Sequence, residues 1–370
     1  MKNLDNLTIH SFRGLQEINL QSLGQINLFV GVNNSGKSSV LEAISTYCRP
    51  LDPLGWLGTA WRREVKSSRT PQWEALKWLF PQNSTIEDFY QGEIHISGDG
   101  KFRVRELKAI YRELARTEPD PDKIESDIEE EETKTVRGAE LEMKATLDKE
   151  GQLSLFEREE EVSKTVQIWE NKRFVNRGKR CKIELPVDTV TAVSHRLEKL
   201  QVELLSEATL YEFKPEIIKL LQVMDEGIID LDLLSVRGNT TGLYIDRQQI
   251  GRSPLSAFGD GVRRLLYIAL TLAKVRGGVL LIDELETAIH TLALKPALSW
   301  LVQACQQMDV QLFATTDSLE TVDELLEASE TIADLVLYRL YPRESQTKLI
   351  RNDRERLKEL REELGMEVRW

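Results

Sequence analysis

The sequence predicts an α/β protein in which helices flank a mixed sheet and an α+β insertion interrupts the middle of the chain. Three observations support this fold class. A glycine-rich loop at 31–38 joins an apolar strand to a helix, and the apolar run 279–282 is followed by two acidic residues. After residue 261, strand-like and helix-like segments alternate, as they do around a largely parallel sheet.

Composition limits the class of protein. The 370 residues are 41% hydrophobic and 30% charged, which suits a buried core and excludes wholesale disorder. The formal net charge of −12 argues against a uniformly basic nucleic-acid coat. The cysteines Cys48, Cys181 and Cys305 are too widely spaced for a zinc site or a disulfide framework. Because the sequence has neither a signal region nor a membrane-length apolar run, we expect a cytoplasmic protein without a membrane partner.

The amino-terminal part reads as short strands, one helix and an acidic run. The apolar patterns predict strands over 7–12, 26–32, 92–97, 139–147 and 165–170, and a helix over 38–47. Residues 118–132 hold nine carboxylates and one lysine, which is typical of a solvated loop.

The carboxyl-terminal part alternates between helices and strands. Residues 194–224 have leucines at helical spacing. Further helices are predicted over 262–275, 292–307, 319–328 and 354–364, and strands over 279–284, 310–316, 335–341 and 347–350.

The segment Gly31-Val-Asn-Asn-Ser-Gly-Lys-Ser38 has the pattern of a phosphate-binding P-loop. Glycines let backbone N–H groups surround phosphate oxygens at the positive end of the following helix. Lys37 would reach the β- and γ-phosphates of ATP, and the Ser38 hydroxyl would bind Mg²⁺. The predicted nucleotide contacts are Gly31, Asn33, Asn34, Ser35, Gly36, Lys37, Ser38 and Ser39.

Two carboxylates follow the apolar strand 279–282. Asp283 stands where a Mg²⁺-bound nucleotide needs a carboxylate, so it is the second predicted metal ligand. Glu284 is the predicted general base that orients and deprotonates the attacking water. Taken alone this pair is also a common strand end, but beside a P-loop it indicates a nucleotide hydrolase.

The chain resembles the ABC-superfamily ATPases of the SMC, RecF and OLD kind, and more narrowly the OLD-like ATPases called AAA15. Four blocks carry the resemblance, which covers residues 7–47 and 255–340. They are Ser11-Phe-Arg-Gly14, Gly31–Ser39 with Leu41-Glu-Ala-Ile44, Phe258-Gly-Asp-Gly-Val-Arg-Arg-Leu-Leu266, and Leu281-Ile-Asp-Glu284 through His290 with Phe313-Ala-Thr-Thr-Asp-Ser318.

This resemblance implies an ABC-type P-loop fold and a nucleotide sandwich. In such ATPases two heads meet head to tail, and the signature loop of one covers the ATP on the P-loop of the other. The signature residues here would be Gly259, Asp260 and Gly261, which stand at the start of a helix. An ordinary glycine turn with an aspartate cap is the alternative.

Two departures from the family pattern lie at positions that would face the γ-phosphate. Gly259 stands where a serine is usual, and Asp317 stands where relatives have a switch histidine. An ionised carboxylate at 317 would repel the γ-phosphate instead of donating to it. Asp317 therefore predicts slow hydrolysis. The glutamine loop of such ATPases could be at Gln72, Gln82 or Gln91.

The resemblance also implies a domain order. We expect the amino-terminal half of the head at 1–105, a β-rich insertion at 106–190, a helical region at 191–250 and the carboxyl-terminal half of the head at 251–370. OLD-family nucleases add a Toprim domain, but only about 50 residues follow Ser318, which is too few for one. We therefore expect a stand-alone ATPase that works with a separate effector protein.

Three functions follow as hypotheses. The first is an ATP-dependent homo-oligomeric sensor, a dimer or a multiple of dimers, that regulates a separate effector, a nuclease, in prokaryotic anti-phage defence of the Gabija or PARIS kind. The second is a RecF-like DNA-repair ATPase. Its DNA-binding surface would be the basic stretch 172–182. The tryptophan-rich stretch 56–78 is a separate candidate for nucleic-acid contact, and each stretch also has a purely structural interpretation. The third is a nucleotide-gated scaffold without useful turnover.

Overall fold

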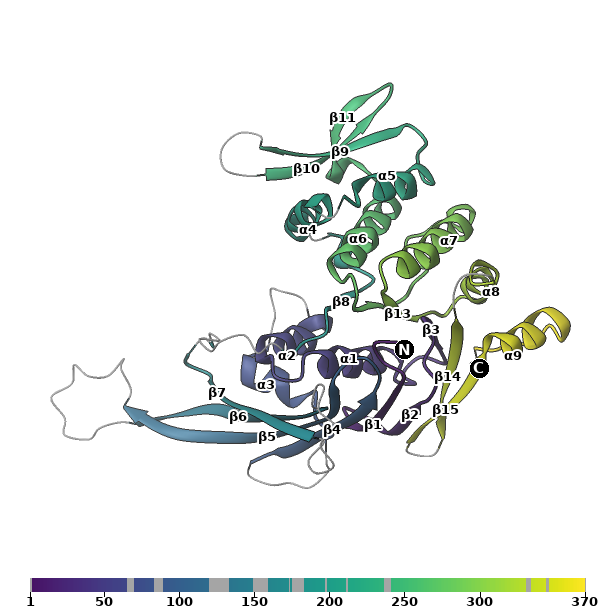
Figure 1. The fold of residues 1–370 in the computed structure, drawn as a ribbon. Helices are drawn as coiled ribbons and strands as arrows, with labels where there is room; N and C mark the ends of the chain where they lie inside the picture. The colour runs from purple at the N-terminus through teal and green to yellow at the C-terminus, as the bar shows by residue number, and fades with distance from the viewer. Residues whose placement is uncertain are drawn as a thin grey trace. The chain divides into compact units, whose positions relative to one another are not determined.

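The protein is described here from a computed structural model. It describes residues 2–64, 70–82, 89–119, 133–148, 159–172, 174, 183–196, 198–210, 212–235, 241–330, 334–343 and 346–369. The chain divides into two compact units (Figure 1). The first unit comprises residues 1–5, 22–41 and 185–370, and the second comprises residues 6–21 and 42–184.

The first unit is built on a six-stranded mixed sheet. Five parallel neighbours run in the order β14–β3–β13–β12–β8, and β15 pairs antiparallel with β14 at one edge. The strands are β3 (Ile26–Val30), β8 (Val187–Val190), β12 (Val279–Ile282), β13 (Gln311–Thr315), β14 (Leu335–Arg343) and β15 (Gln346–Asp353). All residues of β3, β12 and β13 are buried, so the central strands are covered on both faces, as the continuous apolar run of β12 predicts.

Helices supply the core that packs on this sheet. Apolar side chains of α6 (Asp260–Lys274), α7 (Thr291–Gln307) and α8 (Leu319–Ala328) join those of the sheet in one buried cluster. Successive side chains of β3 point to opposite faces. Leu28 therefore belongs to this cluster, while Phe29 stacks between Phe313 and Tyr338. Near the carboxyl end, this unit also contains α9 (Arg354–Lys358) and the π-helical turn η6 (Glu359–Glu363). The predicted fold class, helices around a mixed sheet, is confirmed.

The region 191–250 differs from the predicted helical region. The short turn η4 (Ser194–Arg196) and the helices α4 (Glu198–Leu210) and α5 (Lys214–Gln222) occupy its first part. Then β9 (Ile228–Ser235), β10 (Thr241–Arg247) and β11 (Gly251–Pro254) form an antiparallel sheet, and the turn η5 (Leu255–Ala257) leads to α6. In β10, buried Leu243 and Ile245 alternate with more exposed neighbours, which is the period of a strand and not of a helix.

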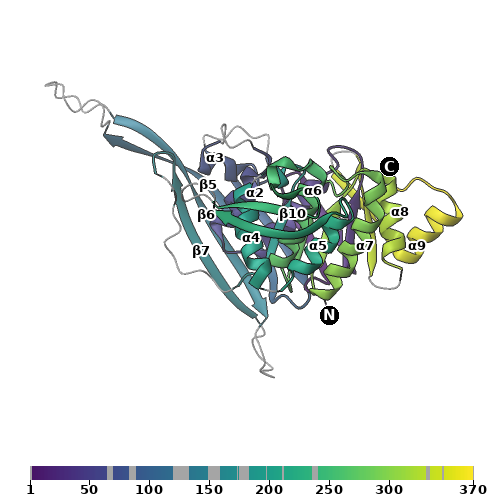
Figure 2. The same cartoon turned by 90° about the horizontal axis from the view of Figure 1, so that it is seen from above.

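The second unit is an antiparallel sheet with helices. Its strand order is β2–β1–β4–β5–β6–β7, and Figure 2 shows β5, β6 and β7 running side by side as a long ribbon. The strands are β1 (Asn6–Phe12), β2 (Leu15–Leu20), β4 (Gln91–Asp99), β5 (Val104–Pro119), β6 (Thr133–Asp148) and β7 (Glu159–Trp169). The helical segments are α2 (Pro53–Ala60), η1 (Trp61–Arg63) and α3 (Gln72–Lys77). Helix α1 (Lys37–Cys48) begins in the first unit and ends in the second.

Helix length and apolarity bear on membrane attachment. Among the residues that the structure describes, none of the helices is both long and apolar enough to cross a bilayer.

Candidate functional site

The P-loop lies between β3 and α1, and its backbone adopts conformations that its sequence favours. Gly31 has φ +148° and Gly36 has φ +98°, both in the region that glycine enters without strain. A side chain at Gly31 would also collide with the carbonyl oxygen of Leu340 and with the Ser35 hydroxyl. Asn34 has φ +64°, which asparagine tolerates better than most residues. The loop can therefore curl tightly at the start of α1.

Lys37 and Ser38 are the first two residues of α1. The Lys37 ammonium donates to the Gly31 carbonyl at 2.5 Å and lies 3.0 Å from Oδ1 of Asp317. The Ser38 hydroxyl donates to Oδ1 of Asp283 at 3.2 Å. The structure thus brings together the P-loop, the end of β12 and the turn after β13. Asn33 is exposed on this loop, and Ser39 continues the helix.

Asp283 follows the last residue of β12. Its Oδ1 accepts hydrogen bonds from the hydroxyls of Ser38 and Thr315, the second at 2.6 Å. A hydroxyl and a carboxylate oxygen are hard ligands of the kind that Mg²⁺ prefers, so Ser38 and Asp283 fit this metal. Among the described residues no cluster of three or more His, Cys, Asp or Glu side chains offers an alternative metal site.

Glu284 has an uncommon backbone conformation, with φ +52°. Its N–H donates to the Thr315 hydroxyl at 2.8 Å, and its carbonyl accepts from Nη2 of Arg264 at 2.6 Å. Its exposed side chain accepts from the Thr287 hydroxyl at 3.0 Å. Such conformations persist where the surroundings hold them, and they are frequent at active sites.

The turn after β13 is held by Glu286. One oxygen of this carboxylate accepts from the Thr316 hydroxyl at 2.6 Å, and the other accepts from the N–H of Asp317 at 2.9 Å. The Asp317 carbonyl accepts from the Arg369 guanidinium at 2.7 Å. These bonds fix the backbone at Asp317, which leaves its carboxylate beside Lys37.

The predicted signature residues stand at the start of α6. Gly259 caps the helix, and Gly261 packs so closely on the Ala288 carbonyl that a Cβ would lie 2.9 Å from it. The Asp260 carboxylate pairs with Arg196 at 2.8 Å and lies 3.6 Å from the buried His195 ring. No hydrogen bond between described residues joins Asp260 to the P-loop of the same chain.

Buried His195 has an altered acidity. Burial lowers the pKa of the imidazole, and Arg264 and Arg196 lower it further, while Asp260 acts in the opposite sense. The Arg196 guanidinium beside Asp260 holds the pKa of that carboxyl below its usual range. At the start of α6, the Asp260 carboxylate thus lies between the Arg196 guanidinium and the buried His195 ring.

The family model described as "AAA domain, putative AbiEii toxin, Type IV TA system" matches residues 26–323, from β3 to within α8. The chain belongs to this family. Its P-loop, its Asp283–Glu284 pair and Asp317 all lie inside the matched range.

Two curated relatives of this AAA-family chain are uncharacterized proteins of Methanocaldococcus jannaschii. One is 34% identical over 113 residues, which make up 30% of this chain and 98% of that protein. The other is 46% identical over 44 residues, which make up 12% of this chain and 20% of that protein. The match therefore spans only a fifth of the second relative's length.

Solved structures show the fold. A crystal structure of the SMC head bound to the C-winged helix domain of ScpA has a TM-score of 0.50 at 12% identity, covering 96% of this chain and 99% of that chain. A Pyrococcus furiosus Smc head with an extended coiled coil has a TM-score of 0.48 at 11% identity, covering 99% of this chain and all of that chain. The first of these structures shows that the AAA-family chain has the fold of an SMC head.

The sequence interpretation missed three positioning residues in this AAA-family chain. Arg264 and Thr315 hold the backbone at Glu284, and Glu286 holds the turn at Asp317. Arg264 had a signal in the sequence, because it is an arginine inside the strongly apolar helix pattern of 262–275. Thr315 and Glu286 lie in the fourth block of the resemblance, but neither residue type reveals these bonds. The sequence favours a helix-start carboxylate at Glu286, whereas the structure places it in a turn.

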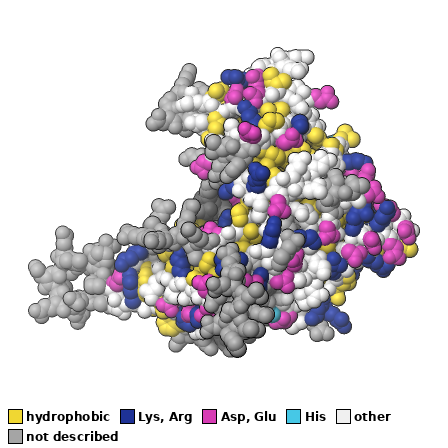
Figure 3. All heavy atoms as spheres, in the orientation of Figure 1, with side chains coloured by type: hydrophobic (Ala, Val, Ile, Leu, Met, Phe, Trp, Pro, Cys, Tyr) yellow, Lys and Arg dark blue, Asp and Glu magenta, His cyan; other side chains and the backbone are white. Residues whose placement is uncertain are grey.

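The second unit contains the stretches considered for nucleic acid. The basic stretch 172–182 lies outside the described residues, apart from Lys172 and Phe174. In the tryptophan-rich stretch, Trp56 is fully buried and Trp73 is 8% exposed, whereas Trp78 is 51% exposed. Figure 3 shows acidic and basic side chains interspersed over the described part of one face, without an extended basic field.

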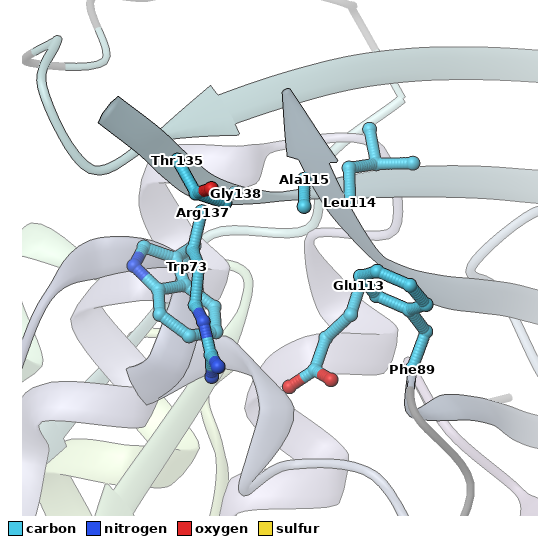
Figure 4. A pocket seen from close by; sticks show the side chains of 8 residues that line it. All are labelled: Trp73, Phe89, Glu113, Leu114, Ala115, Thr135, Arg137 and Gly138. Carbon is cyan, nitrogen blue, oxygen red and sulfur yellow. The ribbon is translucent and has the colours of Figure 1, made fainter. Parts of the chain in front are cut away.

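A hollow of about 140 Å³ lies in the second unit, beside α3 and between β5 and β6. Trp73, Phe89, Glu113 and Arg137 line it, and Figure 4 shows the Arg137 and Glu113 side chains extending to the same side. Glu113 is already bound, since its carboxylate pairs with Lys77 at 2.8 Å and accepts from the Tyr90 N–H at 2.9 Å. Glu113, the acidic residue among those that line the hollow, is therefore already bound by protein groups.

The glutamine candidates are also in this unit. Gln72 accepts from the Phe174 N–H at 3.0 Å, and Gln82 donates to the carbonyls of Lys77 and Phe80. Gln91 begins β4 and is exposed. Gln82 thus has local bonding partners, whereas Gln72 bonds to a residue 102 positions along the chain.

Proposed function

We propose that this protein binds and slowly hydrolyses ATP, and that two copies close head to tail around the nucleotide to regulate a separate effector protein. The effector would be a nuclease in a prokaryotic anti-phage system. The family description names a toxin of a type IV toxin–antitoxin system, and such a system has two components. That description supports a partner protein encoded alongside this chain.

One observation carries the nucleotide site. The Ser38 hydroxyl of the P-loop donates to Asp283 at the end of β12, so residues 245 positions apart form one polar cluster. Gly31 through Ser39 would surround the phosphates, with Lys37 on the β- and γ-phosphates. Ser38 and Asp283 would hold Mg²⁺, which neutralises charge on the phosphate oxygens when it is bound.

Glu284 is the proposed general base. Its side chain is exposed at the site, while hydrogen bonds fix its backbone N–H and carbonyl. A carboxylate that is held in place can orient a water and accept its proton with little reorganisation as the γ-phosphate is attacked.

Asp317 would make this hydrolysis slow. Its carboxylate lies 3.0 Å from the Lys37 ammonium, which is the cation that the γ-phosphate requires. ATP must therefore displace Asp317 from Lys37, and the displaced carboxylate remains near a phosphate of the same charge. A missing or misplaced donor in such a site typically lowers the rate about 10²–10³-fold. Slow hydrolysis suits a switch whose ATP-bound state must persist.

A second copy would complete the site. Gly259, Asp260 and Gly261 have no hydrogen bond to the P-loop of their own chain among the described residues. In the proposed dimer, this helix start would instead face the γ-phosphate on the other copy. The positive end of α6 and the close backbone approach that glycine permits both suit an anion.

The test is molar mass by light scattering, with and without ATP and Mg²⁺, with phosphate release followed in parallel. The variants are Glu284→Gln, which should bind ATP without hydrolysing it, and Lys37→Ala, which should lose ATP. We expect ATP to produce a dimer that decays slowly in the wild type, persists in Glu284→Gln and is absent in Lys37→Ala. A molar mass that is the same with and without ATP in all three proteins would refute the sandwich dimer.

The same samples separate the other two hypotheses. A RecF-like function predicts ATP-dependent binding of a 30-nucleotide duplex that weakens steeply as salt rises. A nucleotide-gated scaffold predicts that Glu284→Gln changes neither phosphate release nor the lifetime of the dimer. The regulator hypothesis predicts that a neighbouring gene product co-purifies with Glu284→Gln in the presence of ATP.

A further inference from the structure

Arg264 lies at the centre of a hydrogen-bond cluster behind the candidate site. Its side chain is fully buried in the second turn of α6. Nη1 donates to the carbonyl of Thr191 at 2.8 Å, and Nη2 donates to the carbonyls of Asp283 and Glu284 at 3.1 and 2.6 Å. One guanidinium therefore joins the helix that carries Gly259–Gly261 to the segments that follow β8 and β12.

Arg264 is a buried cation among mostly apolar buried side chains of α6, so its burial needs a physical explanation. Burial lowers the pKa of Arg264 to about 10, and the carboxylates of Glu284, Glu286 and Asp283 act against that shift. The group therefore remains charged at neutral pH. Its partners are three backbone carbonyl oxygens. The rigid, planar guanidinium can donate to all three at once, whereas an apolar side chain of similar size would fill the space without linking these carbonyls.

The bond to Glu284 has the clearest consequence. Glu284 is in the left-handed region, a conformation that its own sequence does not favour. Thr315 holds its N–H and Arg264 holds its carbonyl, so both peptide groups that flank its Cα are anchored. Because the backbone fixes the direction of Cβ, loss of the Arg264 anchor would redirect the carboxylate.

We propose that Arg264 is a positioning residue that sets the direction of the Glu284 carboxylate and couples this direction to the position of the start of α6. Arg264 is one helical turn beyond Gly261, so a shift of the helix start is carried directly to the carbonyls of Asp283 and Glu284. A phosphate of a second copy that engages Gly259–Gly261 would thereby set the geometry of the general base. This inference rests on the function proposed above.

The experiment compares Arg264→Lys and Arg264→Met with the wild type and with Lys274→Met. Lys274 lies at the other end of α6 and pairs with Asp188 at 2.8 Å, so it controls for the loss of a cation from this helix. Each protein is assayed for ATP affinity with a fluorescent ATP analogue, for dimer formation by light scattering, and for phosphate release per head across a range of protein concentrations.

We expect Arg264→Lys to bind ATP and dimerise within about threefold of the wild type, while its turnover falls about 10–100-fold, because small misplacement of a catalytic group has effects of this size. In the wild type, phosphate release per head should rise as dimers form, and in Arg264→Lys it should stay low although dimers form. Lys274→Met should match the wild type. Arg264→Met should lose at least as much turnover as Arg264→Lys.

Two results would overturn the inference. The first is wild-type turnover in folded Arg264→Lys. The second is a parallel loss of ATP affinity, dimerisation and turnover in Arg264→Lys, which would make Arg264 a folding residue only. A wild-type protein that neither binds nor hydrolyses ATP would instead refute the proposed function itself, whatever the variants do.

Discussion

The Lys37 ammonium lies 3.0 Å from the Asp317 carboxylate, which comes from the turn after β13. The Lys37 side chain is largely buried, while Asp317 is half exposed. The P-loop cation is therefore paired with an anion of the same chain. The Asp317 carboxylate competes with the phosphates of ATP for Lys37, so we expect Asp317 to affect ATP affinity as well as the hydrolysis rate.

Asp317→Asn should tighten ATP binding. The substitution removes both the competing charge and the repulsion of the γ-phosphate, and a partly exposed ion pair accounts for roughly a fivefold change in the dissociation constant. Titration with a fluorescent ATP analogue measures it. Asp334→Asn is the matched control, because Asp334 pairs with Lys2 away from the site and its loss should leave the affinity unchanged. Weaker binding in Asp317→Asn would contradict the competition.

Ser38→Ala should raise the Mg²⁺ concentration that ATP binding requires. The variant removes one of the two protein oxygens proposed to hold the metal and keeps Asp283 in place. We expect about a tenfold higher Mg²⁺ midpoint, with ATP affinity recovered at high Mg²⁺, because supporting ligands typically account for 10–100-fold in metal affinity. Titration of Mg²⁺ at fixed ATP checks this, and an unchanged midpoint would argue against Ser38 as a ligand.

Glu42→Gln should destabilise the second unit. The Glu42 carboxylate is fully buried, and it pairs with Nε of Arg13 at 2.7 Å. Removal of one charge leaves the other poorly compensated, which typically costs about 3–5 kcal/mol. Urea unfolding measures the loss, with Glu17→Gln as the control, since Glu17 is an exposed carboxylate of the same unit. A difference below about 1 kcal/mol between the two variants would show that this pair is unimportant.

His195 should make the first unit sensitive to acid. Burial lowers the pKa of this imidazole in the folded protein. When the pH falls below the pKa of the imidazole in the unfolded chain, the unfolded chain therefore binds more protons than the folded one. The stability contributed by neutral His195 is thus present at pH 7.5 and lost as pH falls toward 5.5. His195→Gln should lose less of its thermal midpoint over that interval than the wild type does. An equal loss in both proteins would exclude His195 as the cause.

The sequence predicts the parts of the head that depend on local patterns. A continuous apolar run identifies β12 and mainly apolar runs identify β3 and β13, because strands buried on both faces are typically rich in apolar residues. The loop at 31–38 is identified by glycine spacing, and both Gly31 and Gly36 have positive φ. These features need only neighbouring residues, so a single sequence is sufficient to find them.

Other parts depend on contacts that are distant in sequence. The leucine spacing of 194–224 predicts a helical region over 191–250, but it does not reveal that β9, β10 and β11 pair with one another. The role of Arg264 depends on carbonyls at 191, 283 and 284, which no sequence period reveals. Likewise, a replaced histidine predicts a change at Asp317 but does not predict its pairing with Lys37.

The chain order of the first unit has a consequence for biosynthesis. Asn27, in the strand that leads into the P-loop, bonds to Leu312, 285 residues further along. A ribosome that adds about 5–20 residues per second needs from roughly 15 s to a minute to supply that partner. Residues 42–184 of the second unit are synthesised within this interval, before β13 and β14 are available to pair with the Ile26–Val30 strand. The nascent chain therefore exposes a mainly apolar segment without strand partners for most of its synthesis. We expect the yield of folded protein to depend on chaperones that bind such segments.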